Sequence, residues 1–162
     1  MPETDIITDR DLSVTAQRYA PYYLSVLNNS LSWGASQLYL EIFGIGLNEW
    51  RVLSALRNEP GIQAMRIVEM VAMNKSIVSR SSRHLEEMGH AVARLVDRKR
   101  LLWLTPSGAA LHDRIIAIAL RREAALLDGF NEAELDTLFA MFERMRQNLS
   151  KIDTVDREAL GR

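Results

Sequence analysis

The sequence predicts a mainly α-helical fold with one small β-hairpin. Over most of the 162 residues, apolar side chains recur every three or four positions, which is the period of an amphipathic helix. The pattern changes over residues 91–104, where two short apolar runs flank a charged tetrapeptide. Such runs on either side of a polar turn are typical of a hairpin. The few glycines and prolines fall at the boundaries of these segments.

Two helices are expected in the first third of the chain. The first covers residues 21–43, with Pro21 in its first turn and Gly44 after its end. We expect Asn48 to cap the second, EWRVLSALRN, which Pro60-Gly61 terminates.

Two shorter helices follow, and the hairpin comes directly after them. The third helix covers about residues 63–72, with Ile67, Met70 and Val71 facing inward. Asn74 is expected to cap the fourth helix, and Gly89 to close it.

Two longer helices are expected after the hairpin. Thr105-Pro106 reads as a cap and a first-turn proline, followed by a helix from Ser107 to about Leu127. Asn131 and Glu134 are spaced as a capping box that opens the last helix. That helix carries an apolar stripe from Leu135 to Ile152, which we interpret as the core of a dimer or of the domain, because such stripes are usually buried.

The fourth helix has two unlike sides. At about 100° per residue, its apolar side holds Val78, Ser81, Leu85 and Met88. The opposite side holds Ser76, Ser79, Arg80 and Arg83. Serine and arginine suit a DNA major groove, because the small side chain permits close approach and the guanidinium can bind guanine. Polar helix faces are more often plain solvated surface. The basic hairpin that directly follows this helix favours DNA binding over that alternative.

The charge distribution also favours DNA binding. The net charge of the chain is −1, yet residues 75–100 hold seven basic and three acidic residues. This segment therefore carries +4 and leaves −5 for the rest. A local basic patch on an acidic body indicates a protein that meets phosphates with one surface.

Several classes of protein are not supported. The chain has no cysteine, which excludes disulfides and thiolate chemistry and fits a reducing cytoplasm. The acidic start is unlike a secretory signal, and no apolar run is long enough to span a bilayer, so we expect a soluble, cytoplasmic protein with no membrane partner. The spacing of His84, His90 and His112 fits no metal site, and we expect no catalytic residues and no cofactor.

The order of elements, four helices, a hairpin and two helices, is that of a winged helix-turn-helix. Three segments carry a closer resemblance: LNEWRVLSAL, KSIVSRSSRHLEEMG and DRKRLLWLTPSG. In this order they resemble the multiple-antibiotic-resistance type (MarR) of winged-helix transcriptional regulators, over about residues 22–149. Between Gly89 and Asp97 the wing is several residues shorter than is usual in that family.

The resemblance implies a homodimeric repressor that binds a near-palindromic double-stranded DNA operator. A small molecule, such as an aromatic acid or its thioester, would release it. Residues 1–12 would form a flexible arm, 13–46 and 107–162 a helical dimerisation region, and 47–106 the DNA-binding lobe.

The residues expected to bind DNA lie on the fourth helix and the hairpin: Lys75, Ser76, Ser79, Arg80, Arg83, Arg98, Lys99 and Arg100. Counting back from Leu104 puts Arg98 at the family's wing arginine, with its acidic partner missing or displaced to Asp97. Which of the three wing cations reaches DNA therefore stays open. The candidate ligand residues are Trp33, Tyr39, Trp50 and Arg51. By the resemblance, Trp33 and Trp50 belong to segments that flank the family's pocket, with core packing as the simpler interpretation for Trp50. Arg51 could bind a ligand carboxylate or form a surface ion pair.

A second class of function is a helical module that binds a ligand or a protein and has lost DNA binding, with the short wing as the reason. An enzyme is a third class, without a motif to support it.

Overall fold

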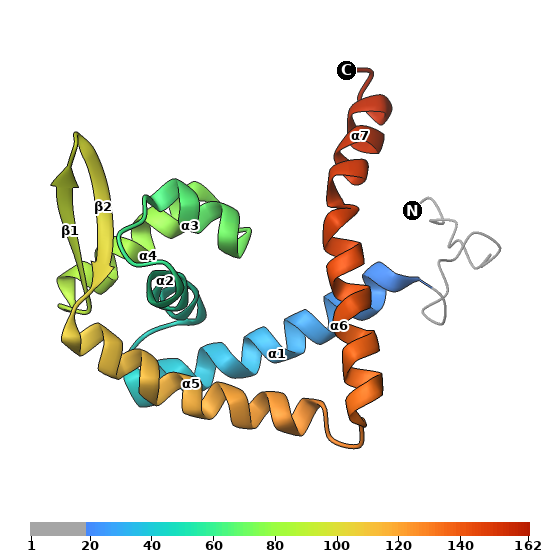
Figure 1. The fold of residues 1–162 in the computed structure, drawn as a ribbon, viewed down its shortest axis with the longest axis horizontal. Helices are drawn as coiled ribbons and strands as arrows, with labels where there is room; N and C mark the ends of the chain where they lie inside the picture. Colours follow the sequence, from blue (N-terminus) through green and yellow to red (C-terminus); the bar gives the residue numbers. More distant parts are fainter. Residues whose placement is uncertain (1–18) are drawn as a thin grey trace, which may run out of the picture. The chain divides into compact units, whose positions relative to one another are not determined.

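The computed structural model describes residues 19–162 (Figure 1). The predicted arm, residues 1–12, lies outside this range. The chain divides into two compact units within one helix, the first ending at Ile116 and the second covering Ala117–Arg162. The elements in order are α1 (Ala20–Phe43), α2 (Leu47–Asn58), α3 (Ala64–Val71), α4 (Lys75–Glu87), β1 (Ala91–Val96), β2 (Lys99–Leu104), α5 (Pro106–Leu126), α6 (Glu132–Gln147) and α7 (Leu149–Ala159). The mainly helical fold with one hairpin is thus confirmed.

Three helices and the hairpin form the core of the first unit. Helices α2, α3 and α4 pack against one another, and β2 packs on α2. The fully buried side chains at their centre are Leu53, Leu56, Ile67, Val78, Leu85 and Leu102. Burying an aliphatic side chain of this size contributes about 1.5–3 kcal/mol, so this cluster fixes how the three helices are arranged.

The start of α2 differs from the prediction. Asn48 is not its cap, because the helix begins at Leu47 and Gly46 holds the cap position with an extended backbone. The backbone N–H of Gly46 donates to Oε2 of Glu49 at 3.1 Å. Glu49, the third residue of the helix, therefore accepts a hydrogen bond from the backbone N–H of Gly46, which would otherwise bond to water.

Both ends of α4 are built as predicted. Oδ1 of Asn74 accepts a hydrogen bond from the backbone N–H of Ser76 at 2.9 Å. At the other end Gly89 has a φ of +75°, and the N–H of His90 bonds to the carbonyl of Leu85 at 2.8 Å. This is the left-handed glycine ending that satisfies the last helical carbonyls.

The hairpin is fully paired. Strands β1 and β2 are antiparallel in a register that runs from Ala91 opposite Leu104 to Val96 opposite Lys99. The two turn residues, Asp97 and Arg98, have φ values of +48° and +63°. Two consecutive left-handed residues match the right-handed twist of the flanking strands, so the wing is short but complete.

The base of the hairpin is fixed to the loop between α2 and α3. The N–H of Leu102 donates to the carbonyl of Ile62 at 3.0 Å, and the N–H of Gly61 donates to the carbonyl of Leu102 at 2.9 Å. Leu102 is fully buried. The inner half of β2 is therefore part of the core.

The junction between the hairpin and α5 depends on a close backbone approach. Oγ1 of Thr105 accepts from the N–H of Gly108 at 3.1 Å and donates to the carbonyl of Gly89 at 2.7 Å. A Cβ on Gly108 would collide with the carbonyl oxygen of His90. Only glycine fits this position, because the obstacle is backbone that cannot rotate away.

The second unit contains α6 and α7. Asn131 and Glu134 form the predicted capping box, with Oδ1 of Asn131 accepting from the N–H of Glu134 at 3.0 Å and Oε2 of Glu134 accepting in return at 2.9 Å. The single last helix that was predicted is interrupted at Asn148, a residue type that favours helix ends. Neither α6 nor α7 has a buried residue. Across residues 19–162, no helix combines the length and the apolar character needed to cross a membrane.

We predict that Gly108→Ala destabilises the first unit. The added methyl group must displace the backbone at His90, which costs about 1–3 kcal/mol as overpacking does elsewhere. Urea unfolding followed by circular dichroism measures the change. The control is Ala110→Ser, an exposed position on the same helix, with an expected effect within about 0.5 kcal/mol. Equal stability of the Gly108→Ala variant and the original chain would contradict the close approach.

Candidate nucleic-acid interface

Helix α4 presents one polar side to solvent. Its buried residues are Val78, Ser81, Ser82 and Leu85, and they face α2 and α3. Its exposed residues include Lys75, Ser76, Ser79, Arg80 and Arg83. The predicted division of the helix holds except at Met88, which was expected to face inward and is 37% exposed. Met88 follows the last helical residue, where the helical period no longer sets its direction.

The serines of α4 fall into two pairs with different surroundings. Ser76 and Ser79 are exposed. Ser81 and Ser82 are buried, and Oγ of Ser81 donates to Oε1 of Glu49 on α2 at 2.8 Å. The hydroxyl of Ser82 has no hydrogen-bond partner within residues 19–162.

Sequence reasoning placed Ser81 on the buried side but missed Glu49 as its partner. That Ser81 has a hydrogen-bond partner could have been predicted, because a buried hydroxyl almost always needs one. Nothing local, however, points to a glutamate 32 positions away. The same carboxylate lies 3.7 Å from Nδ1 of His84.

Most of the cations near α4 are unpaired. Of the seven basic residues between 75 and 100, Arg100 alone forms an ion pair with a described residue, namely Glu86. The six that remain free are Lys75, Arg80, Arg83, Arg94, Arg98 and Lys99. We refer to these six residues together as the basic face. No carboxylate among the described residues pairs with them, so they can meet phosphates.

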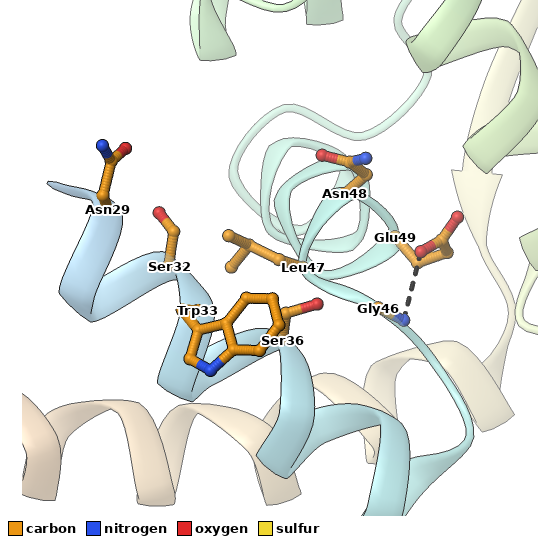
Figure 2. Close-up of a pocket in the computed structure, with 8 residues that line it drawn as sticks. All are labelled: Asn29, Ser32, Trp33, Ser36, Gly46, Leu47, Asn48 and Glu49. Atoms are coloured by element: carbon orange, nitrogen blue, oxygen red, sulfur yellow. Dashed lines mark hydrogen bonds between the residues drawn. The ribbon is translucent and has the colours of Figure 1, made fainter.

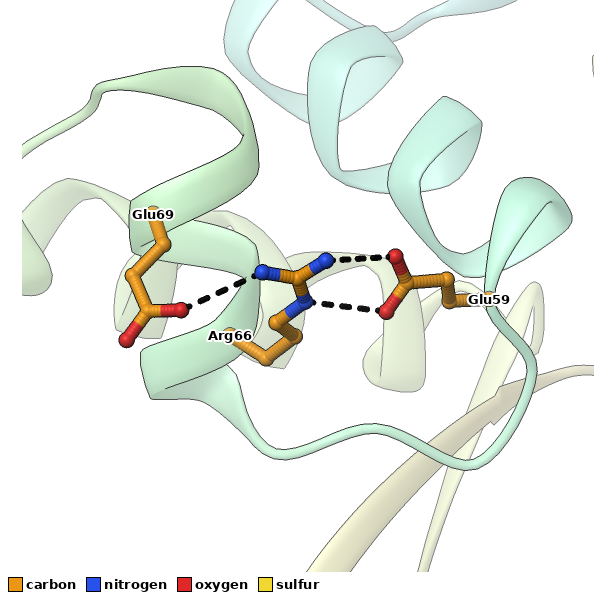
Figure 3. A network of polar contacts seen from close by, with 3 residues as sticks. All are labelled: Glu59, Arg66 and Glu69. Atoms are coloured by element: carbon orange, nitrogen blue, oxygen red, sulfur yellow. Dashed lines mark hydrogen bonds and ion pairs between the residues drawn. The ribbon is translucent and has the colours of Figure 1, made fainter.

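Arg66 on α3 does not belong to the basic face. Its Nη2 and Nε donate to the two carboxylate oxygens of Glu59 at 2.8 and 3.0 Å, and its Nη1 donates to Glu69 at 3.3 Å (Figure 3). These hydrogen bonds hold the pKa of the Glu59 carboxyl below its ordinary value of 4.5 and raise the pKa of Arg66. Arg66 therefore joins α3 to the end of α2 and carries no free charge to a ligand.

The three wing cations that were predicted to bind DNA point in different directions. Residues two apart on a strand share a face, so Arg100 lies on the same face of the hairpin as the buried Leu102. Lys99 lies on the opposite face, with Arg94. Arg98 occupies the turn itself. The structure thus brings Arg98 and Lys99 to the outer part of the wing and ties Arg100 to α4.

The first turn of α4 adds a positive field to the basic face. Lys75 is the first helical residue, and the N-terminus of a helix carries about half a positive charge. Backbone N–H groups at such an end are suited to bind a phosphate.

A pocket of about 460 Å³ lies between α1 and the start of α2 (Figure 2). Its lining is formed by Asn29, Ser32, Trp33, Ser36, Gly46, Leu47, Asn48 and Glu49. The Trp33 side chain is exposed, at 71%, so its ring is available to a flat ligand.

The other three predicted ligand residues do not line this pocket. Tyr39 is buried and meets the ring of Trp50 edge-on at 5.9 Å, and Trp50 stacks on His112 at 5.2 Å. These rings pack together beside α5. Trp50 therefore packs in the core, which was the simpler of its two interpretations. Arg51 is half-buried on α2. Within residues 19–162, no group of three or more His, Cys, Asp or Glu side chains could hold a metal ion.

Comparison with solved structures gives matches over most of the chain. A MarR/EmrR family transcriptional regulator from Acinetobacter sp. ADP1 is 30% identical, with a TM-score of 0.80 over 85% of this chain and 99% of that one. The MepR protein of S. aureus, in a complex with DNA, is 22% identical, with a TM-score of 0.73 over 83% and 99% of the two chains.

BpsR of Bordetella bronchiseptica, whose DNA binding is regulated by 6-hydroxynicotinic acid, is 20% identical, with a TM-score of 0.67 over 76% of this chain and 96% of that one. At this identity BpsR and MepR show that the fold is shared. Comparison with models of protein families gave no match, and neither did comparison with curated protein sequences.

We predict that replacing Arg80 and Arg83 together by alanine abolishes specific DNA binding and leaves folding intact. Each arginine that binds a base contributes roughly 1–3 kcal/mol of discrimination, and both side chains are exposed and form no ion pair with a described residue. Gel-shift titration measures binding, and circular dichroism checks the fold. The control, Lys151→Ala, removes an exposed cation from α7 and should bind normally. Undiminished affinity of the double variant would place the interface elsewhere.

Proposed function

Because the chain belongs to the MarR family of DNA-binding transcriptional regulators, which are not enzymes, we propose that it is a homodimeric repressor whose small-molecule ligand releases it from a near-palindromic operator. The observation that carries this proposal is the basic face. It combines an exposed polar side of α4 with a complete hairpin wing, which is the pair of elements that reads DNA in winged helix-turn-helix proteins.

The proposed DNA contacts divide by position. Arg80 and Arg83 would bind base edges in the major groove, with Ser76 and Ser79 allowing close approach. Lys75 and Lys99 would bind phosphates. Arg98 would reach from the tip of the wing, where the two-residue turn leaves its side chain exposed.

The complete wing also weakens the competing reading of a module that no longer binds DNA. That reading was motivated by the small number of residues between Gly89 and Asp97. The structure accommodates them with six paired positions on each strand and a two-residue turn. We therefore prefer DNA binding as the function of this lobe.

Support for a dimer comes from apolar side chains that one chain leaves uncovered. On α6 and α7 the exposed apolar residues include Phe139, Met141, Phe142, Met145, Leu149, Ile152 and Val155. Exposed stripes of this extent usually mark an interface. We propose that residues 13–46 and 107–162 form the dimerisation region, and that residues 47–106 form the DNA-binding lobe.

The pocket beside Trp33 is the proposed ligand site. Its ring and the surrounding hydroxyl and amide groups suit a flat aromatic acid or its thioester, and BpsR, which shares the fold, responds to an aromatic acid. Glu49 lines this pocket and accepts a hydrogen bond from Ser81 of α4. A ligand that moves Glu49 would therefore act on the helix that carries Arg80 and Arg83.

The salt dependence of operator binding tests the proposed interface. If each dimer neutralises about six to ten phosphates, affinity should fall roughly 10³–10⁵-fold between 50 and 200 mM salt. Fluorescence anisotropy with a labelled operator, selected from random or genomic DNA, measures this. An affinity that does not change with salt would exclude the basic face as the contact surface.

A second test addresses the ligand site. In a thermal-shift screen of aromatic acids and their thioesters, we expect a compound at 100 times its Kd to stabilise the protein by about 2.7 kcal/mol. Trp33→Ala should remove this shift, and Gln37→Ala, an exposed α1 residue outside the lining, should keep it. The same shift in the Trp33→Ala variant would place the ligand elsewhere.

A further inference from the structure

We propose that Arg100 is a positioning residue of the wing and does not itself bind DNA. Through Glu86, it sets the angle between the hairpin and α4 and neutralises a carboxylate at the edge of the basic face. This inference rests on the proposed DNA binding of the lobe.

The contact is short and uses both carboxylate oxygens. Nη2 of Arg100 donates to Oε1 of Glu86 at 2.6 Å and to Oε2 at 2.8 Å. The Glu86 side chain is 24% exposed and that of Arg100 is 56% exposed. An ion pair this accessible adds little to folding stability. We therefore infer that its effect is on the position of the hairpin relative to α4.

The outer half of the hairpin has little else to hold it. Residues 94–100 are all exposed, whereas the inner half is fixed by the buried Leu102 and its bonds to Gly61 and Ile62. For the part of the chain that the structure describes, Arg100 makes the one side-chain hydrogen bond or ion pair between residues 94–100 and the rest of the lobe. A two-stranded hairpin is marginally stable by itself and can twist. Leu102 and Arg100 therefore give the wing two points of attachment.

The direction of Arg100 follows from the pleat of the hairpin. Arg100 shares its face with Leu102, which packs into the lobe, and this face is turned toward α4. Lys99 and Arg94 share the other face. The wing cations thus have separate tasks, because Arg100 reaches inward to the helix while Lys99 stays free.

Glu86 explains why a cation is needed at this point. It lies three residues after Arg83, in the last turn of α4 at the edge of the exposed side. A bare carboxylate there would repel DNA phosphates beside the arginines that are to bind bases. Pairing with Arg100 removes this charge and leaves the six free cations of the basic face.

Binding measurements on Glu86→Ala separate positioning from direct contact. If Arg100 bound a phosphate, removing Glu86 would free its guanidinium, delete a negative charge and tighten binding. As a positioning pair, its loss should weaken operator binding about tenfold, the equivalent of one lost contact of ordinary size. The matched control is Glu87→Ala, the adjacent exposed glutamate, which has no ion pair among the described residues and should bind as the original chain does or slightly tighter.

The salt slope gives a second distinction. Arg100→Ala should weaken binding by a similar factor and leave the slope of log affinity against log salt unchanged. Lys99→Ala, a proposed phosphate contact, should reduce that slope by about 0.9 per protomer. The double variant of Glu86 and Arg100 should bind no more weakly than Arg100→Ala alone, because the two residues act as one unit.

A measurement without DNA tests the attachment directly. The chain has no cysteine, so Val96→Cys, an exposed site on the outer hairpin, accepts a single nitroxide label. Its mobility in electron paramagnetic resonance should rise in the Glu86→Ala and Arg100→Ala backgrounds and stay the same with Glu87→Ala.

Three results would overturn the inference: tighter binding by Glu86→Ala, a reduced salt slope in Arg100→Ala, or unchanged label mobility in both variants. A wild-type protein that binds no operator would instead refute the proposed function. The label would still show in that case whether the pair holds the wing, so the two failures can be told apart.

Discussion

One side of α4 has to be buried, and this constraint decides what the other side can do. Val78 and Leu85 are covered by α2 and α3, and Ser81 is held by Glu49. The helix therefore cannot rotate about its axis without exposing apolar surface and breaking the hydrogen bond between the buried Ser81 hydroxyl and Glu49, and both changes are costly. Arg80 and Arg83 point outward as a consequence, and the proposed reading of DNA depends on that fixed direction.

Carboxylates divide the cations of the lobe into those that build it and those left for a ligand. Arg66 is bound by Glu59 and Glu69, and Arg100 by Glu86. The basic face keeps its charge because no described carboxylate reaches it. A count of lysines and arginines thus overstates the positive charge that DNA would meet. One of the neutralised cations, Arg100, has a proposed function of its own, because its ion pair with Glu86 positions the wing.

The sequence predicted the order of elements up to α6, the capping at Asn74 and Asn131, the hairpin and the outward face of α4, but not the break at Asn148 that separates α6 from α7. These features follow from side-chain period and from contacts within four residues. It misplaced the cap of α2, because a glutamate inside the helix replaced the expected Asn48, and it assigned Met88 to the core although the helix ends before it. For the pocket, the sequence suggested four residues, and the structure brings one of them, Trp33, to its lining.

By itself the sequence determined the local structure and the family resemblance, since helical period, turn residues and caps are encoded by neighbours along the chain. Only the tertiary structure decided which charges and hydroxyls are used. Ser81 meets Glu49 across 32 positions, Arg100 meets Glu86 across 14, and Gly108 lies against His90 across 18. Such pairs form because burial of apolar surface in the core brings distant parts of the backbone together. The hydrophobic effect that drives this burial is non-directional, so a local sequence pattern does not specify which distant residues will meet.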